Sequence, residues 1–125
     1  MTLGRDLGET DLRFINLVAA RRFAGSDPSP PQALDAALAQ VTGVSAYERA
    51  ASLAGVLVAG GVFAVAPRPT AFLAMCVQLN LHGYDLLAPQ GVAAGMMAGL
   101  AAGRLDVHAV ARWLEDRSVG VGISV

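Results

Sequence analysis

The sequence predicts an all-α protein, built as a compact bundle of about six helices. Apolar residues recur at helical spacing in several segments, and clusters of glycine and proline separate these segments from one another. No run alternates between polar and apolar residues clearly enough to predict a sheet. The chain has 125 residues, of which 54% are hydrophobic and 15% charged, so it can form a core and a disordered chain is excluded. We therefore expect a single domain over residues 1–117 and a C-terminal tail over residues 118–125.

Three helices are predicted in the first half of the chain. The first covers about residues 10–22, with Thr10 as the candidate N-cap. Its predicted inward face consists of Leu12, Ile15, Ala19 and Phe23. Residues 25–31 are rich in glycine, serine and proline and break the chain before a short helix at residues 33–41. A third helix follows at about residues 45–58, and its predicted core residues are Ala50, Leu53, Ala54, Leu57 and Val58.

Three more helices are predicted in the second half. Residues 60–69 contain two glycines and two prolines and are predicted to form a loop, because proline interrupts helical hydrogen bonding. A fourth helix runs over about residues 69–81, with Pro69 in its first turn. Its inward residues are Phe72, Met75, Cys76 and Leu79. A fifth helix covers about residues 90–102, and a sixth begins after Asp106 as its N-cap. The tail is predicted to be either a short strand or an ordered arm.

Two charge-free stretches of 18 residues, 50–67 and 86–103, are long enough to suggest membrane spans. The second stretch carries a stripe of glycines at a spacing of four, as in membrane helix dimers: Gly91, Gly95, Gly99 and Gly103. Glycine and proline interrupt both stretches, however, so neither predicts a continuous helix of that length. We expect the glycine stripe to pack against a neighbouring helix within the bundle, and we do not expect membrane insertion.

The charge and the cysteine content bear on which partners the protein binds and on its cellular compartment. The formal net charge of −1 gives no basic field for contacts with phosphates, so direct nucleic-acid binding is not predicted. The single cysteine, Cys76, cannot form an internal disulfide, and no secretory signal is recognisable at the N-terminus. These observations favour a cytoplasmic protein.

Few side chains are suited to catalysis. His82 lies at the predicted C-terminus of the fourth helix and His108 in the first turn of the sixth, and neither has Asp, Glu or Cys at the spacing of a metal site or a catalytic triad. Cys76 is predicted to be a small core residue rather than a nucleophile. No glycine-rich phosphate loop followed by Lys-Ser or Lys-Thr is present in the sequence. We therefore predict no catalytic residue, no metal site and no cofactor.

Several short sequence features follow one another in a particular order. Tyr-Glu-Arg-Ala-Ala at residues 47–51 enters the third helix, and His-Gly-Tyr at residues 82–84 ends the fourth. Gly-Arg-Leu-Asp at residues 103–106 precedes a Trp-Leu pair at residues 113–114. In order and spacing these features resemble the Doc branch, the death-on-curing toxins, of the Fic family. The resemblance covers about residues 6–117 and implies a Doc-like helical domain.

The loop between the third and fourth helices is where that family carries its active-site motif, H-x-F-x-x-[GA]-N-[GK]-R-T. The equivalent stretch here runs from Gly61 to Thr70. Phe63, Ala66 and Thr70 match the motif, and an Ala-rich continuation follows, as in the family. The resemblance therefore identifies this stretch as a degenerate motif loop.

The positions that carry the family's chemistry have changed. The resemblance implies that Gly61 replaces the base His and that Val65 replaces the acidic residue that helps to hold Mg²⁺. It also implies that Pro67 and Pro69 replace the Asn and Arg that bind phosphate. Only Arg68, at a Gly or Lys position of the motif, could still contact an anion. Without these groups a transfer of AMP or phosphate loses both its positioning and its electrostatic stabilisation.

These changes favour a catalytically inactive pseudoenzyme that acts as a protein-binding module. The resemblance implies the toxin-derived half of a bacterial toxin–antitoxin-type pair, whose partner is a protein or peptide: an antitoxin-like segment held in an apolar groove. Self-association is the other way to cover such a groove. The former pocket is expected either to be filled by side chains of the loop or to serve as the groove. The side chains that would fill it are Val62, Phe63, Val65 and Pro67.

Two alternatives stay open. The first is a divergent Fic/Doc toxin that transfers AMP or phosphate to a protein hydroxyl and uses Arg68, Thr70 and His82. The second is a small membrane-associated helical protein that uses the glycine stripe as a packing face.

Overall fold

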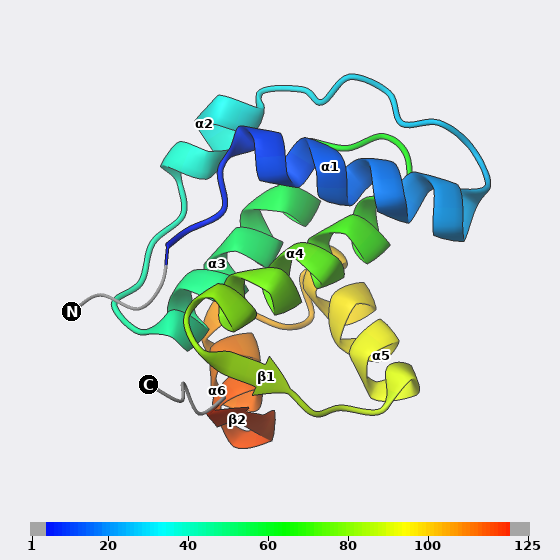
Figure 1. Cartoon of the computed structure of the whole chain (residues 1–125). Coiled ribbons are helices and arrows are strands. Elements are labelled where there is room, and N and C mark those ends of the chain that lie inside the picture. The colour runs from blue at the N-terminus through cyan, green and yellow to red at the C-terminus, as the bar shows by residue number, and fades with distance from the viewer. Residues whose placement is uncertain (1–4, 121–125) are drawn as a thin grey trace.

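Six α-helices make up most of residues 5–120, the part of the chain that the computed structural model describes (Figure 1). In chain order they are α1 (Glu9–Ala19), α2 (Leu34–Ala39), α3 (Ala46–Ala59), α4 (Pro67–Leu81), α5 (Gln90–Ala101) and α6 (Val107–Arg117). A π-helical turn, η1 (Ala20–Ala24), extends α1, and two short strands, β1 (Tyr84–Leu86) and β2 (Ser118–Gly120), form a ribbon. The predicted all-α class is confirmed.

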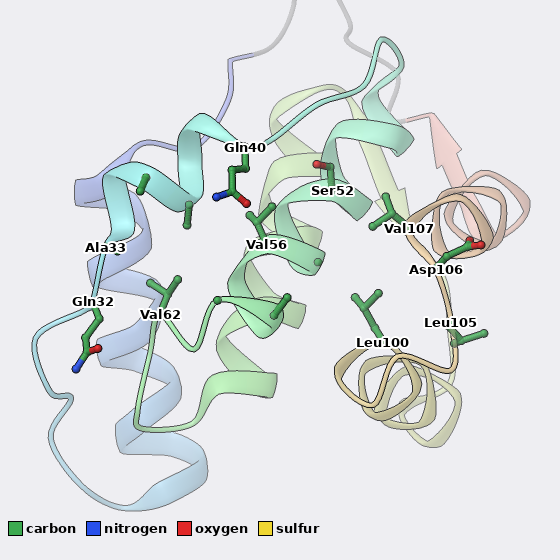
Figure 2. A pocket seen from close by; sticks show the side chains of 15 residues that line it. Gln32, Ala33, Gln40, Ser52, Val56, Val62, Leu100, Leu105, Asp106 and Val107 are labelled. Carbon is green, nitrogen blue, oxygen red and sulfur yellow. The ribbon is translucent and has the colours of Figure 1, made fainter.

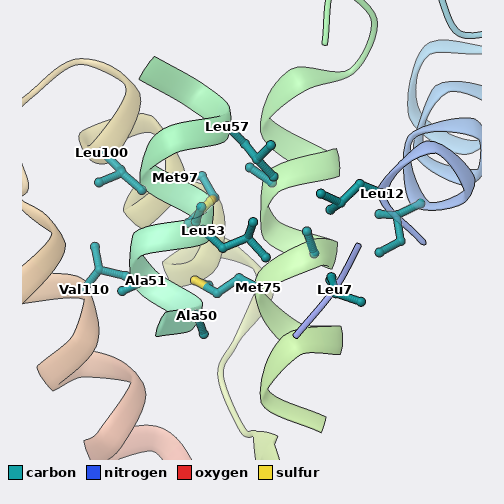
Figure 3. Close-up of a cluster of buried hydrophobic side chains, with 14 of the residues drawn as sticks. Leu7, Leu12, Ala50, Ala51, Leu53, Leu57, Met75, Met97, Leu100 and Val110 are labelled. Atoms are coloured by element: carbon teal, nitrogen blue, oxygen red, sulfur yellow. The ribbon is translucent and has the colours of Figure 1, made fainter. Parts of the chain in front are cut away.

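Helix α3 lies at the centre of the fold, between α4 and α6. It is apolar around nearly its whole circumference, as expected of a fully buried helix, and residues 50–55 are all buried. Small residues let the neighbouring elements approach closely, since a Cβ added at Gly55 would lie 2.9 Å from Cγ2 of Val107. Leu53 and Leu57 point from α3 toward α4 (Figure 3).

The other helices surround this central pair. Helix α1 packs across α4, and α5 contacts both α3 and α4. Leu12 of α1, Met97 of α5 and Val110 of α6 complete the core (Figure 3). The N-terminal end of α4, which follows the predicted motif loop, therefore lies at the edge of the bundle between the end of α1 and α5 (Figure 1).

Side chains cap two of the helices. The Ser45 hydroxyl accepts the Glu48 N–H at 3.1 Å, and the Glu48 carboxylate accepts the Ser45 N–H at 2.9 Å, which forms a capping box at the start of α3 that was not predicted. Asp106 caps α6 by accepting the Ala109 N–H at 2.8 Å, and this predicted cap is confirmed.

The β-ribbon joins the segment after α4 to the end of the chain. Strand β1 pairs antiparallel with β2, with Tyr84 opposite Gly120 and Leu86 opposite Ser118. The start of the predicted tail, residues 118–120, is thus a strand that belongs to the fold. Residues 121–125 of the predicted tail lie outside the described residues. Strand β1 was not predicted from the sequence.

Several predicted boundaries are wrong by one to three residues. Helix α1 begins at Glu9, so Thr10 lies inside it and Gly8 is the N-cap. Helix α4 begins at Pro67, two residues before the predicted start, because proline is tolerated in the first turn, where helical N–H groups have no intrahelical partner. Helix α2 is shorter than predicted, and α5 ends at Ala101.

The predicted inward position of Phe23 is also wrong, because 57% of its surface is exposed. Helix α1 does not continue with α-helical geometry but passes into the π-helical turn η1. A π-helical turn contains more residues than an α-helical turn, so the positions after it shift around the helix axis. Phe23 therefore does not lie on the face formed by Leu12, Ile15 and Ala19. Its ring lies instead beside the Arg22 guanidinium, 5.9 Å from the ring centroid. Three other predicted core residues, Val58, Phe72 and Cys76, are only half-buried.

The glycine stripe of α5 does not pack as predicted. Only Gly99 is tightly packed, since a Cβ there would lie 2.9 Å from Cδ1 of Leu105. Gly91 and Gly95 face open space within the described structure, and Gly103 lies beyond the helix with a φ of 76°. None of the helices within residues 5–120 is long and apolar enough to cross a membrane.

Candidate functional site

The predicted motif loop connects α3 with α4. Gly61 has a left-handed backbone with a φ of 58°, and a Cβ there would meet only open space within the described part of the chain. The Val62 carbonyl accepts the Gln32 N–H at 2.9 Å, so the loop is tied to the segment before α2. Gly61, which the resemblance predicts to stand at the position of the base, is therefore exposed and carries no side chain.

Asn16 of α1 holds the second half of the loop. Its side chain is buried, and Nδ2 donates to the Val65 carbonyl and to Oγ1 of Thr70, each at 2.9 Å. The Thr70 hydroxyl in turn donates to the Ala66 carbonyl at 2.7 Å, and Ala66 has a left-handed φ of 50°. The sequence analysis missed Asn16, although a polar residue between the inward positions Ile15 and Ala19 was a signal for a buried contact.

The start of α4 offers little to an anion. Pro67 and Pro69 have no N–H, and the Thr70 N–H is bonded to the Ala66 carbonyl at 3.0 Å. Of the first four residues of α4, Arg68 is thus the one whose main-chain N–H could still bind an anion. A helix N-terminus binds phosphate through several such groups, so these substitutions weaken the site that this position would otherwise form.

Side chains of the motif loop point into different parts of the molecule. Val62 and Phe63 are buried, Val65 is half-buried and Pro67 is exposed. Val62 and Phe63 therefore pack inside the fold, whereas Pro67 does not. Phe63 lies against a hollow of about 200 Å³ that Arg13 and the 28–31 segment also line.

Val62 borders a larger hollow of about 660 Å³, which crosses α3 between α2 and the α5–α6 connection (Figure 2). Small residues of α3, among them Gly55, Val56 and Ala59, form its base. Its charged residue, Asp106, already caps α6. Its other polar lining residues are Gln32, Gln40 and Ser52, and the Ser52 hydroxyl already accepts the Thr42 N–H at 2.9 Å.

Arg68 and Pro69 line a third hollow of about 640 Å³, here called the apolar groove. Its lining residues are Phe23, Arg68, Pro69, Phe72, Cys76, Leu86, Ala88, Ala93, Ala94 and Met97. Helix α4 forms the base, while η1 and α5 lie on either side of the N-terminal part of α4 (Figure 1). Leu87 and Val92, which neighbour lining residues in the sequence, are exposed as well. The groove is therefore part of a wider apolar surface.

Among the residues that line the apolar groove, Arg68 is the charged one. The Arg22 guanidinium lies beside the ring of Phe23, another lining residue. Asp85 of β1 is exposed and is not among the lining residues. Burial, followed by the negative charge of Asp85, raises the pKa of Cys76 to about 11. The thiol therefore stays protonated at neutral pH and is a poor nucleophile, although it is not the fully buried core residue that was predicted.

His82, the other residue of the alternative catalytic set, belongs to a structural cluster. Its Nε2 lies 3.0 Å from Oδ1 of Asp6. The Asp6 carboxylate also accepts hydrogen bonds from Gln78 at Oδ1 and from Arg49 at Oδ2. The bond from Arg49, and then those from His82 and Gln78, lower the pKa of Asp6 to about 2 against the opposing effect of burial. The α4 helix separates His82 from Arg68 by 14 residues, which corresponds to roughly 21 Å.

The predicted site residues therefore lie in different parts of the structure. Arg68 and Pro69 lie in the apolar groove, Thr70 and Ala66 are bonded to each other, and Gly61 faces outward. His108 is exposed on α6. Within residues 5–120, no group of three His, Cys, Asp or Glu side chains is arranged to hold a metal ion.

Comparison of the chain with models of known protein families and with curated proteins finds no match.

Proposed function

We propose that this chain is a degenerate Fic/Doc-like pseudoenzyme that acts as a protein-binding module. In this proposal it is the toxin-derived half of a bacterial toxin–antitoxin-type pair in the cytoplasm, and the apolar groove holds a segment of the partner. The observation that carries the proposal is the pairing of exposed Phe23 with half-buried Phe72 in one open groove. Aromatic side chains in a recess are typical anchors of protein interfaces.

The size of the groove supports a peptide segment as the occupant. Its α4 residues extend from Arg68 to Cys76, about 12 Å along the helix axis, which is the length of roughly two helical turns. Met97 and Ala93 lie nearly buried in the wall of the groove, and exposed Ala94 leaves room for close approach of a partner segment.

The motif loop supports the absence of group transfer. Exposed Gly61 has no side chain to accept a proton, and Pro67 and Pro69 give no N–H to a phosphate. The Thr70 hydroxyl is buried and bonded to both Asn16 and Ala66. An in-line transfer requires a positioned base and stabilised charge, and these residues supply neither.

Co-expression with each product of the adjacent genes tests the proposal. The wild-type chain should co-purify with one of them in a fixed ratio, and Phe23→Asp should reduce complex formation at least about tenfold by removing an anchor. Phe14→Asp is the matched control, since Phe14 is 64% exposed on α1 but does not line the groove. A monomeric wild-type chain that binds neither product, or a Phe23→Asp variant that still binds, would overturn the proposal.

A separate assay tests the loss of activity. Incubation of the chain with radiolabelled ATP, Mg²⁺ and cell lysate should label no protein. A labelled band that disappears in an Arg68→Ala variant would overturn the pseudoenzyme assignment and favour the divergent toxin.

A further inference from the structure

We infer that the outer face of α1 is a dimer interface, on which a second copy of this chain packs with its own α1 antiparallel to the first. This surface is separate from the apolar groove, because Phe14 and Val18 at its centre do not line that groove. The inference does not depend on the proposed function. It follows from exposed apolar side chains at the middle of α1, from opposite charges at its two ends, and from the way these features match in an antiparallel pair.

The middle of the outer face is apolar and open to solvent. Phe14 is 64% exposed and Val18 is 40% exposed, although both are large apolar side chains. Leu17, their neighbour on the helix surface, is half-buried. The side chains with which α1 enters the core, such as Leu12 and Ile15, are buried on the inner side of the helix. Aromatic residues are enriched at the centre of protein interfaces, and Phe14 holds that position here.

Charges are confined to the two ends of this face. The first turn of α1 carries Glu9 and Asp11, and η1 at the other end carries Arg21 and Arg22. Residues 14–20, between these ends, include no charged residue. An apolar centre surrounded by a polar and charged rim is the usual composition of a protein interface.

The charges at both ends are available to another molecule. Asp11 contacts Arg5 at 2.9 Å and Arg21 contacts Asp27 at 3.4 Å, but 62% and 66% of the two arginine side chains are exposed. Within residues 5–120, Arg22 has no carboxylate at ion-pair distance. Solvent-exposed ion pairs hold their members weakly, so Asp11 and Arg21 can each take part in a further contact.

The two ends match when the second helix runs in the opposite direction. If Phe14 lies beside Val18 of the second copy, the two-fold axis passes α1 near residue 16, and Asp11 lies about level with Arg21 of the second copy. The symmetry forms this contact twice, once at each end. A parallel pair would instead place Asp11 beside Asp11 and Arg21 beside Arg21. The face is thus complementary to itself, which favours a second copy as its occupant.

Sedimentation velocity of the full chain at increasing concentration tests the inference. The wild type should pass from monomer to dimer in about the micromolar range, since one helix per copy gives a small interface. Phe14→Asp should raise the dimer dissociation constant at least about tenfold, because two carboxylates would enter the apolar centre. Leu87→Asp is the matched control, since Leu87 is similarly exposed but lies outside α1. Circular dichroism verifies that each variant is folded.

Charge should also contribute to the dimer. Arg21→Glu removes the partner of Asp11 and places two carboxylates at each end of the interface, so the dissociation constant should rise about fivefold. Higher salt should weaken the wild-type dimer and have less effect on the Arg21→Glu variant. A dimer that is equally stable in both chains would contradict the assigned role of these charges.

Engineered cysteines test the direction of the second helix, with Cys76→Ala leaving one thiol per chain. In the antiparallel pair, the thiols that Leu17→Cys introduces lie about 3 Å apart along the helix axis, whereas those of Thr10→Cys lie about 18 Å apart. A disulfide needs Cα atoms within about 7 Å, so oxidation should cross-link the first variant and not the second. A parallel dimer would cross-link both variants and would overturn the inference.

The remaining outcomes are equally decisive. A wild type that stays monomeric up to about 1 mM has no interface of this kind. A dimer that Phe14→Asp leaves intact while Phe23→Asp dissociates it would place the second copy in the apolar groove. Either result would overturn the inference, whereas co-expression with the adjacent gene products decides the proposed function separately.

Discussion

The two faces of α4 are made differently. The face toward α3 and α1 consists of Thr70, Ala71, Ala74, Met75, Gln78 and Leu79, all buried. The face toward η1 and α5 carries Phe72 and Cys76, which are half-buried, with exposed Arg68 at its end. One face thus closes the core with both small and large side chains, while an aromatic residue is left in an open groove. A high proportion of apolar residues therefore does not by itself indicate a large core.

The strongest test of this difference compares truncations on the two faces. Met75→Ala should lower the free energy of unfolding by about 3 kcal/mol, because it leaves a cavity in a closed environment. Phe72→Ala should cost less than about 1.5 kcal/mol despite the larger side chain, because the groove is already open to solvent. Urea unfolding of both variants gives the two values. Equal losses would show that the groove side is as closed as the core side.

A second test concerns the contact of α1 with Thr70, which lies on the buried face of α4. Asn16→Ala removes the donor to Thr70 and to the Val65 carbonyl, so we expect a loss of about 1 to 2 kcal/mol. Faster hydrogen exchange in the motif loop should accompany it. Thr10→Ala, an exposed substitution on the same helix, serves as the control. Unchanged exchange rates would mean that the loop is held by Phe63 alone.

A third and smaller effect is expected at the C-terminal end of α4. Asp6→Asn removes the charge that Arg49 and His82 contact, and we expect it to cost less than about 1 kcal/mol at pH 7, since water screens this partly exposed cluster. The folded pKa of Asp6, about 2, lies below its ordinary value of 3.8. The stabilisation is therefore present above about pH 4 and is lost as pH falls toward 2.

Stability curves of the wild type and the Asp6→Asn variant against pH should converge in that interval. Asp116→Asn, at an exposed position on α6, should run parallel to the wild type. A difference between wild type and Asp6→Asn that persists at pH 2 would contradict the assigned role of the Asp6 charge.

Sequence reasoning succeeded where structure is determined within a few residues. The helix class and the cap at Asp106 depend on short-range hydrogen bonds and on helical spacing. It failed where distant segments meet. The β1–β2 pairing joins residues 84–86 to 118–120, and such short strands have no pattern of their own. The π-helical turn that exposes Phe23 likewise left no signal that we recognised.

For the candidate site, the sequence identified the loop but not its surroundings. The breaks in the chain, with glycines at residues 60–61 and prolines at 67 and 69, are visible in the order of residues alone. The path of α1 and α5 past α4 decides which of these residues share a cavity, and this depends on tertiary packing. Arg68 consequently shares its hollow with Phe23 and Met97, which are far from it in sequence.

The contacts of the N-terminal segment restrict the order in which the chain can fold. The Leu7 N–H donates to the buried Gln78 side chain across 71 residues, and Asn16 reaches Thr70 across 54. During synthesis α1 therefore leaves the ribosome long before the helix that it packs against. Since native contacts at such separation form late, α1 must stay unattached until α4 has emerged. The side chains that α1 buries in the folded chain, Leu12 and Ile15 among them, are exposed until then and available to chaperones.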